Sequence, residues 1–206
     1  MLDRIRRMGY PAFLRISLIA AFIVFTVKDL VSYARYTGAV SSGKVSELSV
    51  SLDECETLSM KKLENGAYAA TDPDSQIIIT ADRPVAAVRL DMTTYLEPGE
   101  IPVFYTRSEG ERFTDNNRRW AHPNGEGGYS VLLNNNGYTY VYRLRIDPTV
   151  YAGNRIEIKD ITLNPRLAPG DFLCFDAVFL ARTFFYGVLV SLLLKELFSH
   201  TGEEKA

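Results

Sequence analysis

The stretch Tyr138–Ile146 reads YTYVYRLRI and decides the fold class of the middle of the chain. Apolar and polar residues alternate along it with a period of two, which is the repeat of a β-strand and not of a helix. The alternation predicts one face made by Tyr138, Tyr140, Tyr142, Leu144 and Ile146, and a second face made by Thr139, Val141, Arg143 and Arg145.

Short runs of the same kind lie on both sides of this stretch, and turn residues such as Pro98-Gly99 separate them. The further predicted strands are Leu48–Leu52, Gln76–Thr80, Pro84–Met92, Ile101–Thr106, Tyr129–Leu133 and Ile156–Leu163. About seven or eight short strands with frequent turns are typical of a β-sandwich or jelly roll. We therefore expect a mainly β domain in this part of the chain.

Two local signals refine the predicted sheet. Asn134–Gly137 stands between two predicted strands and contains Asn-Gly, which favours a tight hairpin connecting them. The alternation of Ile156–Leu163 slips by one residue at Lys159-Asp160, and such a slip predicts a β-bulge at that point.

Both ends of the chain are apolar enough to predict transmembrane helices, which need about 20 residues each. The first contains the charge-free run Ile16–Val27, which becomes long enough when Arg15 and Lys28 extend toward the membrane surfaces. The predicted organisation is a cytoplasmic N-terminus over 1–9, a transmembrane helix over 10–36, an ectodomain over 40–168, a second transmembrane helix over 172–198 and a cytoplasmic tail over 199–206.

The charge distribution agrees with this organisation. Residues 1–39 carry a net charge of +4, residues 40–170 of −4 and residues 171–206 of −2, which sum to the net charge of −2. The basic N-terminal segment predicts a cytoplasmic N-terminus, and the lack of a basic excess argues against nucleic-acid binding. Two alternatives remain open at this stage: a cleaved signal peptide ending after Ala34 or Ala39, and apolar core helices of a soluble protein.

Ionisable residues interrupt the predicted spans, among them Arg15, Asp176 and Arg182. Such side chains are costly when they face lipid, so we expect them to contact the helices of a membrane partner.

The sequence contains no nucleophile elbow, phosphate-binding loop, dinucleotide-binding glycine motif or HExxH motif, so we expect no enzyme. The segment Arg107–Gly128 is predicted to be a long loop and contains the only tryptophan, Trp120. An aromatic ring beside amides, carboxylates and guanidinium groups suits contact with a glycan or a partner. The candidate contact residues are Asp115, Asn116, Asn117, Arg118, Arg119 and Trp120; the alternative is that Trp120 packs into the core and its neighbours are solvated.

The order of these features resembles a known class of domain. Asp72-Pro73 precedes Gln76–Ile79, and the later segments are Val88–Met92, Val103–Tyr105, Gly110–Phe113, Leu144–Pro148 and Ile156–Leu163. Over about residues 70–165 this pattern resembles the extracytoplasmic, carbohydrate-binding-module-like jelly-roll domains that accompany bacterial membrane proteins of surface-polysaccharide assembly.

The resemblance implies a location in the bacterial cytoplasmic membrane, where the two predicted spans and the basic N-terminal segment would leave both termini inside and the ectodomain outside. It also implies a non-catalytic accessory role beside a polytopic glycosyltransferase or transporter, since this chain has two predicted spans only. No resident cofactor is expected, but calcium held by turn oxygens of Asp72, Asp74 or Asp160 is an implication of the same resemblance. The alternatives are a free-standing glycan-binding or adhesion module and a self-associating structural protein.

Overall fold

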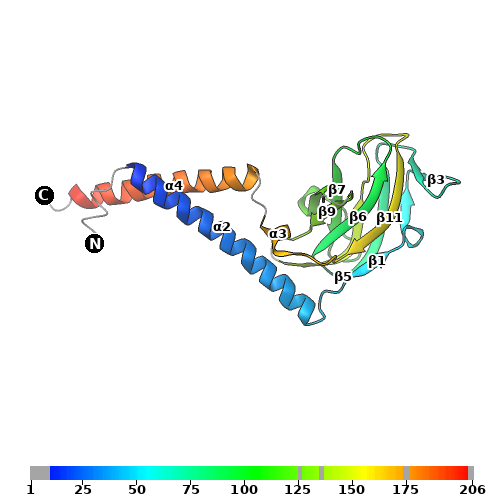
Figure 1. Ribbon diagram of the computed structural model, residues 1–206, viewed down its shortest axis with the longest axis horizontal. Helices are drawn as coiled ribbons and strands as arrows, with labels where there is room; N and C mark the ends of the chain where they lie inside the picture. The colour runs from blue at the N-terminus through cyan, green and yellow to red at the C-terminus, as the bar shows by residue number, and fades with distance from the viewer. Residues whose placement is uncertain (1–9, 125–126, 135–136, 174–176, 204–206) are drawn as a thin grey trace. The chain divides into compact units, whose positions relative to one another are not determined.

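The computed structural model describes residues 10–124, 127–134, 137–173 and 177–203 (Figure 1). The chain divides into two compact units, one made of Met1–Tyr33 with Ala168–Ala206 and the other of Ala34–Leu167. The first unit contains helices and the second contains a β-sandwich, and each is described by itself below.

Two long helices account for the apolar ends of the chain: α2 (Tyr10–Ser41) and α4 (Ala177–Glu203). Within the described residues, the segments Tyr10–Ser41 and Ala177–Leu197 are both long and apolar enough to cross a membrane. Pro11 stands in the first turn of α2, where its missing N–H costs no hydrogen bond. Gly43, with a φ of +72°, follows the helix in the left-handed conformation that commonly ends helices.

Close packing joins α2 and α4 within the helical unit. A Cβ atom added to Gly187 would lie 2.6 Å from the Leu18 side chain, so the backbone of α4 approaches α2 there as only glycine allows. The Phe25 ring meets the rings of Phe179 and Tyr186, with centroids 6.3 and 5.5 Å apart. A short helix, α3 (Pro169–Phe172), precedes α4.

The described residues of the second unit form eleven strands in one antiparallel path with the order β2-β5-β10-β7-β8-β9-β6-β11-β4-β3, while β1 pairs with β11. The strands are β1 (Leu48–Val50), β2 (Glu56–Leu58), β3 (Met60–Lys62), β4 (Tyr68–Ala70), β5 (Gln76–Val85), β6 (Ala87–Thr94), β7 (Ile101–Thr106), β8 (Arg118–Pro123), β9 (Tyr129–Leu132), β10 (Thr139–Ile146) and β11 (Arg155–Leu163). Two single-turn helices, η1 (Leu52–Glu54) and η2 (Asp115–Asn117), lie between them.

The path folds into two layers because β8 belongs to both. Its residues 118–121 pair with β7, and His122 and Pro123 pair with β9. One layer is β2-β5-β10-β7-β8 and the other is β9-β6-β11-β4-β3 with β1. A single cluster of buried apolar side chains from both layers forms the core. The predicted fold class, a β-sandwich between two apolar helices, is confirmed.

The predicted bulge in the last strand is confirmed, because the register of β11 against β6 shifts between Ile158 and Asp160. A second bulge was not predicted: β10 shifts against β5 between Val141 and Arg143. The shift reverses the faces of the first half of β10. Val141 is fully buried, whereas Tyr140 is 47% exposed, so the prediction that Tyr140 shares a face with Leu144 and Ile146 is wrong.

Three other sequence-based predictions need correction. The hairpin predicted at Asn134–Gly137 is wrong, because β9 pairs with β6 and β8 while β10 pairs with β5 and β7; positions 135–136 lie outside the described residues. The predicted strand Pro84–Met92 is divided at Ala86 between β5 and β6. The predicted loop Arg107–Gly128 contains strand β8. In each case the local signal was real, but pairing with distant strands determined the structure.

Candidate functional site

Strand β8 presents the predicted contact residues on two opposite faces. Ala121 pairs with Ile101 and is buried in the core, and Arg119 pairs with the buried Val103 on that same side. Because side chains alternate along a strand, Arg118 and Trp120 lie on the outer face. Trp120 is 37% exposed there, so the alternative in which it packs into the sandwich core is wrong.

A row of paired residues continues this outer face across the layer. Arg118 pairs with Phe104 of β7, Phe104 pairs with Arg145 of β10, and Arg145 pairs with Ile78 of β5. We call this outer surface the Trp120 face; it comprises Trp120, Arg118, Phe104, Arg145, Arg143 and Phe113.

Guanidinium groups lie against aromatic rings throughout the Trp120 face. The Cζ atom of Arg118 is 4.6 Å from the ring centroid of Trp120 and 5.9 Å from that of Phe104. Arg145 Cζ is 5.1 Å from the Phe104 centroid, and Arg143 Cζ is 5.8 Å from that of Phe113. Cations at such distances are attracted by the ring quadrupole, so the side chains hold one another in place.

Carboxylates fix the same guanidinium groups from the side. Arg118 pairs with Asp115 at 2.8 Å and Arg143 with Glu56 at 3.1 Å. Arg145 pairs with Asp74 and makes two hydrogen bonds, of 2.7 and 2.8 Å, to Asp147. Burial raises the pKa of Asp147, although its hydrogen bonds with Arg145 act in the opposite direction. The face therefore carries paired charges and aromatic rings in a fixed arrangement.

The remaining predicted residues lie in the turn before β8. Asn117 donates a hydrogen bond to Glu111 Oε1 at 3.1 Å, and Glu111 Oε2 accepts one from the backbone N–H of Arg107 at 2.5 Å. Asn116 is exposed beside them. Glu111 was not predicted, and neither were Phe104, Arg143 and Arg145 as site residues. Only strand register, which depends on distant pairing, brings these residues to Trp120.

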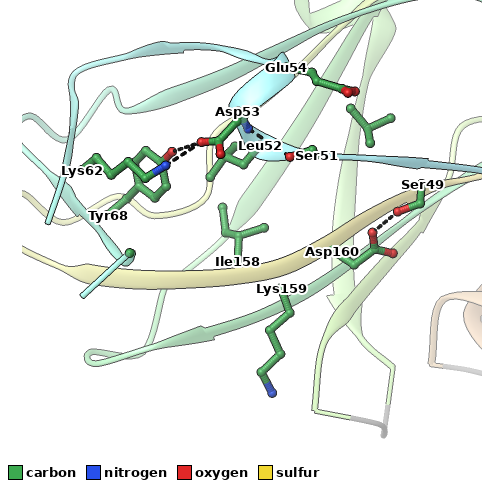
Figure 2. A pocket seen from close by; sticks show the side chains of 12 residues that line it. Ser49, Ser51, Leu52, Asp53, Glu54, Lys62, Tyr68, Ile158, Lys159 and Asp160 are labelled. Atoms are coloured by element: carbon green, nitrogen blue, oxygen red, sulfur yellow. Dashed lines mark hydrogen bonds and ion pairs between the residues drawn. The ribbon is translucent and has the colours of Figure 1, made fainter. Parts of the chain in front are cut away.

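A separate cleft of about 440 Å³ opens beside strand β11 (Figure 2). It arises because β4 pairs with Arg155 and Ile156, whereas β1 pairs with residues 161–163, leaving that edge of β11 without a strand partner in between. The residues that line it are Ser49, Val50, Ser51, Leu52, Asp53, Glu54, Lys62, Gly66, Tyr68, Ile158, Lys159 and Asp160.

Two carboxylates that line this cleft, those of Asp53 and Asp160, already have hydrogen-bond partners. Figure 2 shows Asp53 facing Lys62 and Tyr68, with Lys62 Nζ 2.6 Å from Asp53 Oδ1. The hydrogen bond from Lys62 lowers the pKa of Asp53. Asp160 accepts hydrogen bonds from Ser49 and Thr162. Burial acts to raise the pKa of Asp160, but these hydrogen bonds hold it below its usual value.

The carboxylates that the resemblance implies as calcium ligands also have partners within the chain. Asp72 accepts a hydrogen bond from the backbone N–H of Asp74 at 2.8 Å, and Asp74 pairs with Arg145 and Gln76. Among the described residues, no three His, Cys, Asp or Glu side chains group closely enough to hold a metal ion. Calcium held by turn oxygens of Asp72, Asp74 or Asp160 stays a prediction.

Of the charged residues predicted in the spans, the structure describes two. Arg15 is exposed on α2, and Asp176 lies outside the described residues. Arg182 Cζ is 4.2 Å from the ring centroid of Phe25 and 5.7 Å from that of Phe179. Its Nε is buried and has no hydrogen-bond partner among the described residues. The guanidinium group attracts the carboxylate of Asp29 on α2, a residue that was not predicted.

Comparison with known proteins adds two similar solved structures. A low-affinity xylan-binding module, CBM86 from Roseburia intestinalis, is 13% identical over 61% of this chain and 98% of that module, with a TM-score of 0.39. The CsCBM6-3 module from Clostridium stercorarium, solved in complex with cellobiose, is 10% identical over 60% of this chain and 95% of that module, with a TM-score of 0.31. No protein-family model matches the chain, and no curated protein matches it significantly.

Proposed function

We propose that this chain is a non-catalytic accessory membrane protein whose β-sandwich binds a glycan on the Trp120 face. In this proposal it assists a polytopic glycosyltransferase or transporter in the synthesis, export or modification of a cell-surface glycan. The observation that carries glycan binding is the exposed Trp120 ring on a rigid strand, with the Arg118 guanidinium 4.6 Å from its centroid.

The chemistry of a sugar fits this arrangement. A sugar ring has an apolar side made of C–H groups, which packs on an aromatic ring, and hydroxyl groups around its edge that hydrogen-bond to charged side chains. Trp120 supplies the aromatic platform, while Arg118 and its partner Asp115 supply donors and acceptors at its edge. Little ordering entropy is lost on binding, because these side chains are already held by one another.

The paired charges favour a neutral glycan. Arg118, Arg143 and Arg145 each have a carboxylate partner, so the Trp120 face offers no free cation for an acidic polymer. A neutral chain uses the same groups as hydrogen-bond donors and acceptors without separating an ion pair.

The helices supply the membrane part of the proposal. Side chains such as Ile23 and Val24 of α2 and Leu180 and Phe185 of α4 are exposed, as lipid or partner helices would require. We assign Arg15, which is exposed on α2, together with Arg182 and Asp176 to a contact with a partner helix, because ionisable side chains are costly when they face lipid. The Arg182 Nε has no hydrogen-bond partner among the described residues.

Glycan binding is tested on the full-length protein in detergent, by calorimetric titration with a panel of neutral and acidic oligosaccharides. Trp120→Ala should weaken binding of the neutral ligand about tenfold or more, equivalent to about 1.4 kcal/mol. Tyr95→Ala is the matched control, because Tyr95 is an exposed aromatic residue outside the Trp120 face. Equal affinity of the Trp120→Ala and unmodified proteins would refute this site.

The accessory role is tested by purifying the tagged protein from its native membrane in mild detergent and identifying co-eluting proteins by mass spectrometry. We expect stoichiometric recovery of a polytopic transferase or transporter, reduced by Arg182→Gln. Arg166→Gln, which removes an exposed charge outside the long helices, should leave recovery unchanged. Recovery of this chain alone would refute the accessory role and leave glycan binding to be judged by the titration.

A further inference from the structure

Four large side chains are exposed together at one end of the β-sandwich. They come from the loops that connect β6 to β7 and β10 to β11. Tyr95 is 82% exposed, Leu96 46%, Val150 41% and Tyr151 50%. We call these four residues the Tyr95 tip. Ser46 and Asn164, where the sandwich connects to the rest of the chain, lie at the opposite end, because β6 begins and β11 ends there.

A buried asparagine fixes the two loops to each other. Asn154 is fully buried; its Oδ1 accepts a hydrogen bond from the Leu96 backbone N–H at 2.9 Å, and its Nδ2 donates to the Leu96 carbonyl at 3.1 Å. The same Nδ2 donates to Thr149 Oγ1 at 2.9 Å. Backbone hydrogen bonds add to the connection, from Tyr95 to Arg155 at 2.9 Å and from Val150 to Pro98 at 3.2 Å.

Close packing makes the loop pair still more rigid. Gly99 has a φ of +77°, and a Cβ atom added there would lie 2.8 Å from Val150 Cγ2. The first loop therefore packs directly under Val150, which it can do only with glycine at this position. Because the exposed side chains stand on a preorganised backbone, ordering them on binding costs little entropy.

The charges around the Tyr95 tip limit what it can bind. Glu97 and Glu100 are exposed beside it, and segments 93–101 and 147–155 contain one basic residue, the exposed Arg155, whose carbonyl accepts the Tyr95 N–H. The two exposed carboxylates outnumber this one guanidinium group, and the excess negative charge disfavours nucleic acids, anionic lipids and acidic glycans. Two tips meeting each other would also bring the carboxylates of both copies together, which disfavours self-association through this surface.

The apolar side chains favour a protein over a sugar. Tyrosines beside aliphatic residues are typical of the desolvated centre of protein interfaces, with charges at the rim. Tyr95 and Tyr151 could contact either a sugar or a protein, whereas Leu96 and Val150 provide apolar contact but no flat ring for a sugar and no hydrogen bond for its hydroxyls. We propose that the Tyr95 tip docks into an apolar recess of another protein, edged by basic side chains that face Glu97 and Glu100. This interaction goes beyond glycan binding and does not depend on it.

The test places a photo-crosslinking amino acid, p-benzoylphenylalanine, at position 95 of the full-length protein in its native membrane. Position 140 is the matched control, because Tyr140 is also a partly exposed tyrosine but is paired with Pro84 on β5, away from the tip. We expect one crosslinked species with a protein of a different mass at position 95, and none at 140. Peptide mapping should place the crosslink next to lysine or arginine of that protein.

Charge reversal decides whether the crosslink reports the proposed interface. Glu97→Lys combined with Glu100→Lys should reduce the crosslink about tenfold, because these exposed residues would then face basic side chains. Leu96→Asp should reduce it similarly, and the thermal unfolding midpoints of both variants should stay close to that of the parent. A crosslink that is insensitive to the charge reversal, a dimer of this chain, a product carrying only glycan, or no product above the position 140 level would each overturn the proposal. None of these results bears on Trp120.

Discussion

A buried asparagine connects neighbouring segments at each end of the β-sandwich, but the two ends differ in how exposed their large side chains are. At the chain-connection end, Asn164 is 3% exposed; its Oδ1 accepts from the Ala86 N–H at 2.7 Å, and its Nδ2 donates to the carbonyls of Ser46 and Pro84 at 3.0 Å each. At the opposite end, the fully buried Asn154 connects two loops in the same way.

The side chains around these two asparagines are placed differently. Val45, Ala86 and Leu133 near Asn164 are at most 1% exposed, whereas the four residues of the Tyr95 tip are 41–82% exposed. Both ends are well hydrogen-bonded, so exposure at the tip does not result from poor order. The difference supports the proposed docking role of the tip, since singly exposed apolar residues are ordinary but a rigid group of four is not.

The largest expected effect comes from removing either asparagine. Asn154→Ala and Asn164→Ala should each lower the free energy of unfolding by about 2–4 kcal/mol, because several buried backbone or hydroxyl groups lose their partners. Chemical denaturation of the full-length protein measures this. Asn164→Gly isolates the lost hydrogen bonds from backbone strain, since Asn164 has a φ of +55°. A loss well under 1 kcal/mol for Asn154→Ala would show that the loops do not depend on it.

A smaller effect is expected at the loop contact beneath the tip. Gly99→Ala should cost about 2–3 kcal/mol, because the new Cβ adds a clash with Val150 to the strain of a positive φ. Gly66→Ala is the matched control, since Gly66 has a φ of +86° and nothing within 4 Å of an added Cβ. The control should lose only about 1–2 kcal/mol. Equal losses in the two variants would contradict the packing of Gly99 against Val150.

On the Trp120 face, a still smaller effect on stability is expected. Trp120→Ala should change the free energy of unfolding by about 1 kcal/mol or less, because the ring lies outside the core. A thermal unfolding scan run beside the glycan titration checks it. Loss of 3 kcal/mol or more, the cost typical of a buried aromatic residue, would mean that the ring supports the sandwich.

The smallest expected signal comes from Cys55, in the body of the sandwich between the two ends. Burial, with a contribution from Glu54, raises the pKa of the Cys55 thiol to about 11. Only about 0.1% of it is therefore thiolate at pH 8, and alkylation should be slow and rise about tenfold per pH unit below this pKa. Mass spectrometry after maleimide treatment of a Cys174→Ser protein measures the rate. Rapid labelling at pH 8 in the folded protein would contradict the half-buried placement of Cys55.

Local patterns predicted the elements of the sandwich but not their neighbours. Ile101–Thr106 and the bulge at Lys159 follow from alternation within one strand, and the structure confirms both. The partners of β9 and β10 were wrong because an Asn-Gly turn signal says nothing about which layer each strand joins. The bulge at Tyr142 gave no signal, since a tyrosine fits either face.

The candidate site was predictable to a similar extent. Trp120 and Arg118 were predicted from the sequence, but Phe104 and Arg145 lie beside them only because of the register of three strands. The Tyr95 tip was not predicted at all. Its two loops are far apart in the sequence, and their connection depends on one buried amide that resembles an ordinary turn residue.

A crossed experiment tests the central claim that the sandwich carries two independent binding surfaces. Glycan titration and position 95 crosslinking are measured on the same full-length protein with Trp120→Ala and, separately, with Glu97→Lys and Glu100→Lys combined. We predict that Trp120→Ala loses glycan binding and keeps the crosslink, while the charge reversal loses the crosslink and keeps glycan binding. If either change abolished both activities in a protein that remains folded, the two surfaces would be one site and the account would be wrong.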